Sequence, residues 1–119
     1  MNGPLKEPLL PKFKYLFPAL IDEWHDGDTC YVHRGARPGV IIHGEHVRVQ
    51  GINAPELNTA AGKAAAAYAS SICPPGTLVM LECEDEDKYG RLLAYVIMPN
   101  GQDFGKMMIA AGQAVAYVV

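Results

Sequence analysis

The sequence lacks any apolar run that could cross a membrane, since none approaches the roughly 18 consecutive apolar residues that a spanning helix needs. It also lacks a recognisable secretory signal, because lysines and prolines break up the apolar patches near its N-terminus. We therefore expect an intracellular protein without membrane contact, unless a signal has been removed from the sequence.

Paired cysteines and spaced metal ligands are missing as well. The three cysteines are an odd number and none are spaced as CxxC, which argues against a disulfide framework and a structural zinc site. We expect buried free thiols. The four histidines lie on strand-like segments without helical i, i+4 spacing, so we expect surface histidines rather than metal ligands. These residues are Cys30, Cys73, Cys83, His25, His33, His43 and His46.

A surplus of basic residues is also absent, because ten Lys and Arg stand against thirteen Asp and Glu, for a net charge of −3. This balance excludes a strongly basic surface of the kind that binds nucleic acid regardless of sequence. If the partner is a nucleic acid, the attraction has to come from a local site or from a bound cation.

Apolar residues are plentiful: they make up 50% of the 119 residues, which excludes a disordered chain and suits one compact domain. Apolar alternation predicts strands, and the alanine-rich segment after Thr59 predicts a helix that Thr59 caps. We expect a loop at 35–39, a strand interruption near Gly44 and an acidic turn at 84–90. The predicted strands are 17–25, 29–34, 40–52, 77–84, 92–98 and 114–119, and the predicted helices are 59–72 and 106–111.

This order of elements predicts a mainly β fold with helices, of the α+β class. About five strands, with one helix inserted between the third and fourth and a short second helix, fit a Greek-key barrel of the OB-fold type. Barrels of this kind carry many functions, so the fold alone leaves the chemistry open.

The first stretch with chemical potential is Asp26-Gly27-Asp28-Thr29. Two carboxylates on either side of a glycine can direct their oxygens to one point, and oxygen ligands are what a hard cation such as Ca²⁺ requires. The alternative is an ordinary Asp-Gly hairpin turn, which on this stretch alone is favoured.

The second stretch runs from Val47 to Glu56. Arg48 lies in mid-strand among apolar neighbours, where a guanidinium is costly unless it faces a groove or an anion. Glu56 follows Pro55, whose fixed φ stiffens the backbone that presents the carboxylate. A glutamate that takes a proton from water and an arginine that stabilises phosphoryl charge suit phosphodiester hydrolysis. Taken alone, Arg48 is better explained as a surface arginine on a strand.

The third stretch is Asp87-Lys88-Tyr89-Gly90-Arg91, before a predicted strand. The paired donors of Arg91 match phosphate geometry, so it would form the second arm of a phosphate clamp, with Lys88 and Tyr89 holding other phosphates or a base. A polar hairpin turn is the alternative. The acidic residues at 82 and 84–87 would repel a polyanion unless a solvated turn holds them away, and they predict weak, salt-sensitive binding.

In order and spacing, the three stretches "DGDT", "VRV-GI-APE" and "DKYGRLLAYV" resemble the staphylococcal nuclease (thermonuclease) family, as does the tail "GQAVAYV". The resemblance covers Leu16 to Val119. It divides the chain into an N-terminal extension at 1–15 and a nuclease-like OB-fold domain at 16–119.

The resemblance implies an OB-fold barrel that hydrolyses DNA or RNA phosphodiesters with Ca²⁺ and little sequence preference. By position, Glu56 would be the general base, and Arg48 and Arg91 would bind the scissile phosphate. Calcium would be held by Asp28 directly, by Asp26 through water, and by the Ala54 carbonyl. Lys88 and Tyr89 would contact a terminal phosphate, and Tyr117 would stack on a base.

Two departures from the family pattern affect these expectations. Asn53 stands where the family usually has a metal-binding aspartate, so its oxygen can still coordinate calcium but with one negative charge fewer, and we expect weaker metal affinity. The link from Glu56 to the helix is short, so we expect no mobile flap beside the site.

Two functions from different classes fit the sequence. The preferred one is a metal-dependent nuclease, because Arg48, Glu56 and Arg91 are all present together with the Asp26 and Asp28 pair. The alternative is a non-catalytic OB-fold module of the same family that binds nucleic acid or protein through the same cleft. A binding module has no need of the three carboxylates.

Overall fold

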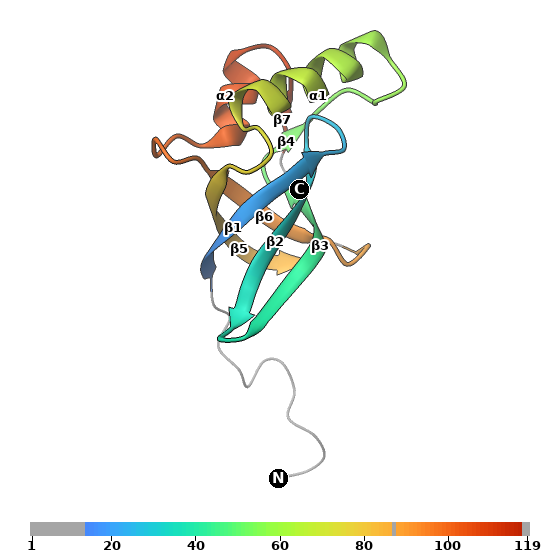
Figure 1. The fold of residues 1–119 in the computed structure, drawn as a ribbon. Coiled ribbons are helices and arrows are strands. Elements are labelled where there is room, and N and C mark those ends of the chain that lie inside the picture. Colours follow the sequence, from blue (N-terminus) through green and yellow to red (C-terminus); the bar gives the residue numbers. More distant parts are fainter. Residues whose placement is uncertain (1–13, 87, 118–119) are drawn as a thin grey trace.

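The computed structural model, which describes residues 14–86 and 88–117, is built on a closed five-stranded barrel (Figure 1). The strand order around it is β1-β2-β3-β6-β5, and β1 pairs with β5 to close it. Only the β3–β6 pairing is parallel, which gives the Greek-key arrangement. The strands are β1 Tyr15–Trp24, β2 Thr29–Arg37, β3 Val40–Val49, β5 Leu78–Glu86 and β6 Leu92–Ile97. The predicted OB-type barrel, mainly β with two helices, is therefore confirmed.

Two helices lie together at one end of the barrel (Figure 1). Helix α1, Ala60–Ile72, begins after Thr59, whose Oγ1 accepts a hydrogen bond from Gly62 N at 3.0 Å. Helix α2, Phe104–Ala110, begins after Asp103, whose Oδ1 accepts from Lys106 N at 3.1 Å. Both caps satisfy amide donors that a helix leaves free in its first turn.

The core joins the barrel to the helices. Residues that alternate along the strands point inward and are fully buried, among them Val47, Val49 and Val96. At the helical end, Phe104 stacks on Trp24 with ring centroids 4.3 Å apart. The indole N–H of Trp24 donates to the carbonyl of Cys73 at 2.8 Å, so the end of β1 is fixed to the end of α1.

The third strand breaks at a different glycine from the one expected. Gly44 does have a positive φ of 65°, but β3 continues through it, because the pairing with β2 shifts register between Val32 and Arg34. The break falls instead at Gly51, with φ 89°, after which β4, Ile52–Asn53, pairs with β7, Val115–Ala116.

Several element bounds also differ from the prediction. β2 extends to Arg37 through part of the expected loop, and β5 extends to Glu86 into the expected acidic turn. Helix α2 begins two residues early because Asp103 caps it. The last strand is only two residues long, because Ala114 and Tyr117 lie outside it, and positions 118–119 of its predicted range lie outside the described residues.

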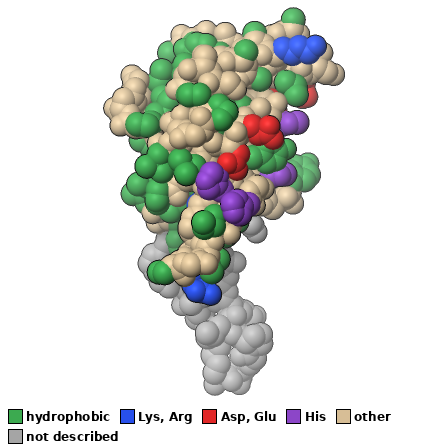
Figure 2. Space-filling model, in the orientation of Figure 1, with side chains coloured by type: hydrophobic (Ala, Val, Ile, Leu, Met, Phe, Trp, Pro, Cys, Tyr) green, Lys and Arg blue, Asp and Glu red, His purple; other side chains and the backbone are tan. Residues whose placement is uncertain are grey.

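The surface carries two notable groups of side chains. Histidine and acidic side chains gather on the face shown in Figure 2. Between β1 and β2, His33 Nδ1 lies 2.6 Å from Asp22 Oδ1. Leu16 and Leu78, at outward positions on β1 and β5, expose 63% and 57% of their surface. All three cysteines are buried and none forms a disulfide, as predicted. No helix in the described part of the chain is long and apolar enough to span a membrane.

Candidate active site

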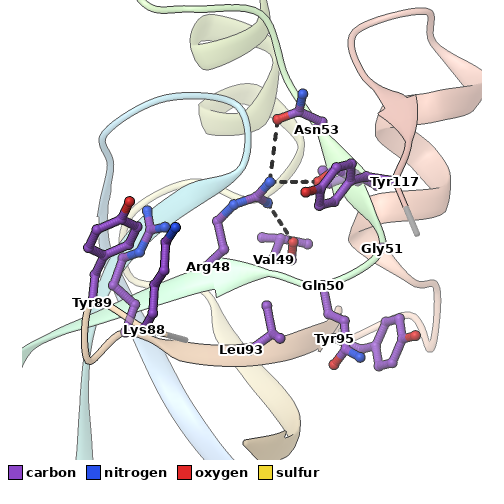
Figure 3. Close-up of a pocket in the computed structure, with 12 residues that line it drawn as sticks. Arg48, Val49, Gln50, Gly51, Asn53, Lys88, Tyr89, Leu93, Tyr95 and Tyr117 are labelled. Carbon is purple, nitrogen blue, oxygen red and sulfur yellow. Dashed lines mark hydrogen bonds between the residues drawn. The ribbon is translucent and has the colours of Figure 1, made fainter. Parts of the chain in front are cut away.

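A groove of about 860 Å³ runs along the outer face of the barrel where β3 and β6 lie side by side. Figure 3 shows Arg48 in its middle, with Lys88 and Tyr89 to one side and Tyr95 and Tyr117 to the other. The structure therefore brings together six residues that were predicted as site residues: Arg48, Asn53, Lys88, Tyr89, Arg91 and Tyr117. Cationic and aromatic side chains in one groove are the combination that holds single-stranded nucleic acid.

Arg48 is oriented by the strand that carries it. Because Val47 and Val49 point into the core, Arg48 points outward into the groove. Its Nη1 donates to the carbonyl of Val49 at 2.7 Å and its Nη2 to that of Ile52 at 2.9 Å. Nη2 also lies 3.4 Å from Asn53 Oδ1. The backbone at the turn after β3 thus holds the guanidinium in place, and only 13% of the side chain is exposed.

The Asp26-Gly27-Asp28 turn is wedged between three other segments. A Cβ on Gly27 would lie 2.9 Å from Ala54 Cβ and 3.0 Å from Ala65 Cβ, and it would also crowd Met108. Gly27 is not among the glycines with positive φ, so the glycine is required by close packing rather than by the backbone conformation of a primed turn. This packing fixes both carboxylates beside the segment after β4.

Asp28 is the buried member of the acidic pair. Its Oδ2 accepts from Ala54 N at 2.8 Å and lies 3.5 Å from Arg48 Nη2, while its Oδ1 accepts from Thr29 Oγ1 at 3.1 Å. Asp26 Oδ1 accepts from Asp28 N at 3.0 Å. Burial, followed by the contact with Asp26, raises the pKa of Asp28 above its ordinary value, although the Ala54 amide and Arg48 oppose the shift.

The donor set around Asp28 suits a hard cation that keeps most of its water. Asp26 and Asp28 offer carboxylate oxygens, and the adjacent Asn53 and Ala54 offer carbonyl oxygens, which are the ligand types that Ca²⁺ takes. Two carboxylates in contact, one of them buried, are an excess of negative charge that a cation would relieve. Within the described residues, no group of three or more His, Cys, Asp or Glu is placed to hold a metal. An ion here would therefore have few protein ligands.

Lys88 and Arg91 flank the ring of Tyr89 at the other side of the groove. The Lys88 Nζ lies 5.2 Å and the Arg91 Cζ 5.5 Å from the ring centroid, within the range of cation–π attraction. Tyr89 is 72% exposed. The two cations are thus held at the rim of the groove next to an accessible ring. The expectation that the acidic residues 84–87 form a solvated turn concerns side chains that lie outside the described residues.

Glu56 is one of the four predicted site residues that do not line the groove. Its side chain is exposed, and it is absent from the residues that line the groove. Its backbone carbonyl accepts from Thr59 N at 3.1 Å and from Thr59 Oγ1 at 2.7 Å, so its main chain is fixed to the start of α1. Asp26, Asp28 and Ala54 also lie outside the lining, but they are linked to Arg48 through Asp28.

Six residues of the groove were not anticipated: Val49, Gln50, Gly51, Ile52, Leu93 and Tyr95. Tyr95 could have been found, because Leu93 and Tyr95 alternate on one face of β6, two and four residues after Arg91, and all three line the groove. Gly51 has no comparable sequence signal. Its carbonyl accepts from Tyr117 N at 2.9 Å, which places Tyr117 at the groove through a contact between distant segments.

Comparison with known protein families agrees with this geometry. A search of curated proteins found no match to the chain. Residues 46–119 match the family described as staphylococcal nuclease homologue, and this range carries every residue that lines the groove. As the match spans more than half of the sequence, the chain belongs to the staphylococcal nuclease homologue family.

Proposed function

We propose that this protein is a metal-dependent nuclease that hydrolyses phosphodiester bonds in DNA or RNA. Family membership supports a nuclease-like or nucleic-acid-binding function in general. The observation that carries the more specific proposal is that Arg48 and Arg91 line the same groove. Arg48 Nη2 also lies 3.5 Å from Oδ2 of the buried Asp28. A binding module has no use for an acidic pair with one buried member beside its phosphate contacts.

In the proposed mechanism, Arg48 and Arg91 bind the phosphate and stabilise the charge that develops on its oxygens. Arg48 is suited to this because two backbone carbonyls hold its guanidinium, so little reorganisation is needed during the reaction. Glu56 takes a proton from the attacking water. Its side chain is exposed on a main chain that Thr59 fixes, so the carboxylate is accessible to water while its attachment point is rigid.

The proposed cofactor is Ca²⁺, held by Asp28 and Asp26 with the Asn53 and Ala54 carbonyl oxygens. The bound ion would supply positive charge beside the phosphate. Because Asn53 lacks the charge of an aspartate, Asn53→Asp should tighten calcium binding in calorimetry. Asn58→Asp, at an exposed asparagine nearby, is the matched control. Equal affinities for Asn53→Asp and the wild-type protein would remove Asn53 from the site.

The test of catalysis is the release of acid-soluble nucleotides from heat-denatured DNA, with added Ca²⁺ and then with a chelator. We expect release by the wild-type protein only with calcium, and its loss in Glu56→Gln. Glu23→Gln, at an exposed glutamate on β1, is the control and should retain activity.

A second function, nucleic-acid binding without cleavage, is favoured by one observation: Glu56 does not line the groove. If a folded wild-type protein binds single-stranded DNA at millimolar calcium and releases no nucleotides, this second function replaces the first.

A further inference from the structure

One end of the groove holds an aromatic ring and an amide that the proposed mechanism does not use. Gly51 has a φ of 89°, and a Cβ placed on it would lie 3.4 Å from Tyr95 Cε1, so the chain turns closely beside the Tyr95 ring. Gln50 N donates to the carbonyl of Ala94 at 2.8 Å, which holds Gln50 against the neighbouring strand. Figure 3 shows the Gln50 side chain reaching toward Tyr95.

The Gln50 amide is available for a ligand. Gln50 is half-buried and lines the groove, and within the described residues no protein group binds its side-chain amide. None of its polar atoms is buried without a partner, so the amide faces open space. An amide offers donors and an acceptor side by side, the pattern that pairs bidentately with adenine. A tyrosine ring offers a face on which any base can stack.

We propose that Tyr95 and Gln50 form a nucleobase subsite that favours adenine in an unpaired strand. The proposal rests on the proposed function in one respect, that the groove binds nucleic acid. The base has to be unpaired, because a base within a duplex has no free face for Tyr95. The subsite adds a base preference to a groove whose other contacts, from Arg48, Lys88 and Arg91, recognise phosphate without regard to sequence.

The spacing along β6 keeps this subsite apart from the cationic end. Arg91, the residue before β6, and Tyr95 within β6 are four residues apart, which corresponds to about 13 Å of extended chain at a rise of roughly 3.3 Å per residue. Arg48 lies between them, opposite Leu93 in the pairing of β3 with β6. The groove volume of about 860 Å³ is near the upper end of the roughly 300–1,000 Å³ typical of small-ligand sites, so it has room for more than one nucleotide.

The test is equilibrium binding of fluorescein-labelled single strands of six deoxyadenylates, six deoxycytidylates or six thymidylates, measured by anisotropy with a chelator so that no cleavage occurs. We expect the deoxyadenylate strand to bind the wild-type protein about 5- to 10-fold more tightly than the others. Gln50→Leu should reduce this preference to less than about twofold. Tyr95→Leu should weaken binding of all three strands about 10-fold.

Two matched variants serve as controls: Gln102→Leu and Tyr15→Leu remove an exposed amide and an exposed ring outside the groove, and both should keep the preference. Equal binding of the three strands by the wild-type protein, or an unchanged preference in Gln50→Leu, overturns the subsite and leaves the cleavage assay to decide the proposed function. A preference that depends on Gln50 in a protein that does not cleave supports the subsite and refutes the nuclease. Failure of a folded protein to bind any strand in chelator overturns the subsite, and the cleavage assay with calcium then decides the proposed function.

Discussion

Asp28 illustrates a conflict between stability and chemistry at a single residue. Its carboxylate is buried next to Asp26, and both effects raise its pKa, so folding disfavours the charged form relative to the unfolded chain. A cation or a phosphate-binding arginine requires the charged form. The proposed site therefore needs the charged form at a position where burial disfavours it, as is common for side chains that serve function rather than stability.

The first prediction is that Asp28→Asn stabilises the metal-free protein at neutral pH. A raised folded-state pKa means that stability is fully present below the unfolded pKa and is lost as the pH rises through the folded pKa. The amide carries no charge, so the advantage of the variant should grow as the pH rises above the ordinary value of 3.8. Urea unfolding with a chelator at several pH values measures the difference in unfolding free energy between the variant and the wild-type protein, with Glu23→Gln as control. A less stable variant at neutral pH would mean that the Arg48 contact outweighs burial.

The second prediction concerns the thiols. Burial raises the pKa of Cys73 to about 11, from an ordinary 9.0, and raises that of Cys30 further. Near pH 8 the Cys73 thiolate fraction is then only about one-hundredth of that of a free cysteine. We expect all three cysteines to react with Ellman's reagent quickly in denaturant and very slowly in the native protein. A fast native reaction at any one of them would contradict the buried positions.

At the scale of elements, local patterns were predictable and long-range pairings were not. The outward direction of Arg48 followed from its alternation with Val47 and Val49, and α1 followed from its alanines and the Thr59 cap. The strand break could not be placed, because Gly44 and Gly51 look alike in sequence. A bulge in the pairing of β3 with β2 lets the strand continue through Gly44. The strand ends before Gly51 because the next segment, β4, pairs with β7, more than 60 residues away. The same distant pairing brings Tyr117 to the groove.

The third prediction tests how α1 supports the segment that carries Glu56. A Cβ on Gly62 would lie 1.7 Å from the Glu56 carbonyl oxygen and 2.9 Å from Leu57 Cα, both backbone atoms. Gly62→Ala should therefore displace this segment and cost about 1–3 kcal/mol of unfolding free energy. Gly35→Ala is the matched control, since a Cβ there meets nothing within 4 Å. Guanidinium unfolding measures both, and equal stabilities would show that the segment yields easily.

At the scale of the whole molecule, the net charge of the chain and the charge of the side chains in the groove have opposite signs. The chain carries a net charge of −3, yet three cations, Arg48, Lys88 and Arg91, share one groove. Long-range steering of a polyanion is therefore unfavourable, and attraction acts only within about 10 Å of the groove at ordinary ionic strength. Affinity should accordingly be weak and depend on direct phosphate contacts.

The fourth prediction is how strongly the affinity for a single strand depends on salt concentration. Each phosphate neutralised on a single strand contributes roughly −0.7 to the slope of log affinity against log salt, so three cations give a slope of about −2. Lys88→Ala should lower the magnitude of the slope by about 0.7, because one contact is lost. Lys63→Ala, at an exposed lysine on α1 away from the groove, should leave it unchanged. Anisotropy titrations with a thymidylate strand at several salt concentrations, in chelator, give the slopes for the wild-type protein and for both variants. A flat response would mean that base stacking on the tyrosines, rather than phosphate contact, holds the strand, and the roles of Arg48 and Arg91 would then have to be abandoned.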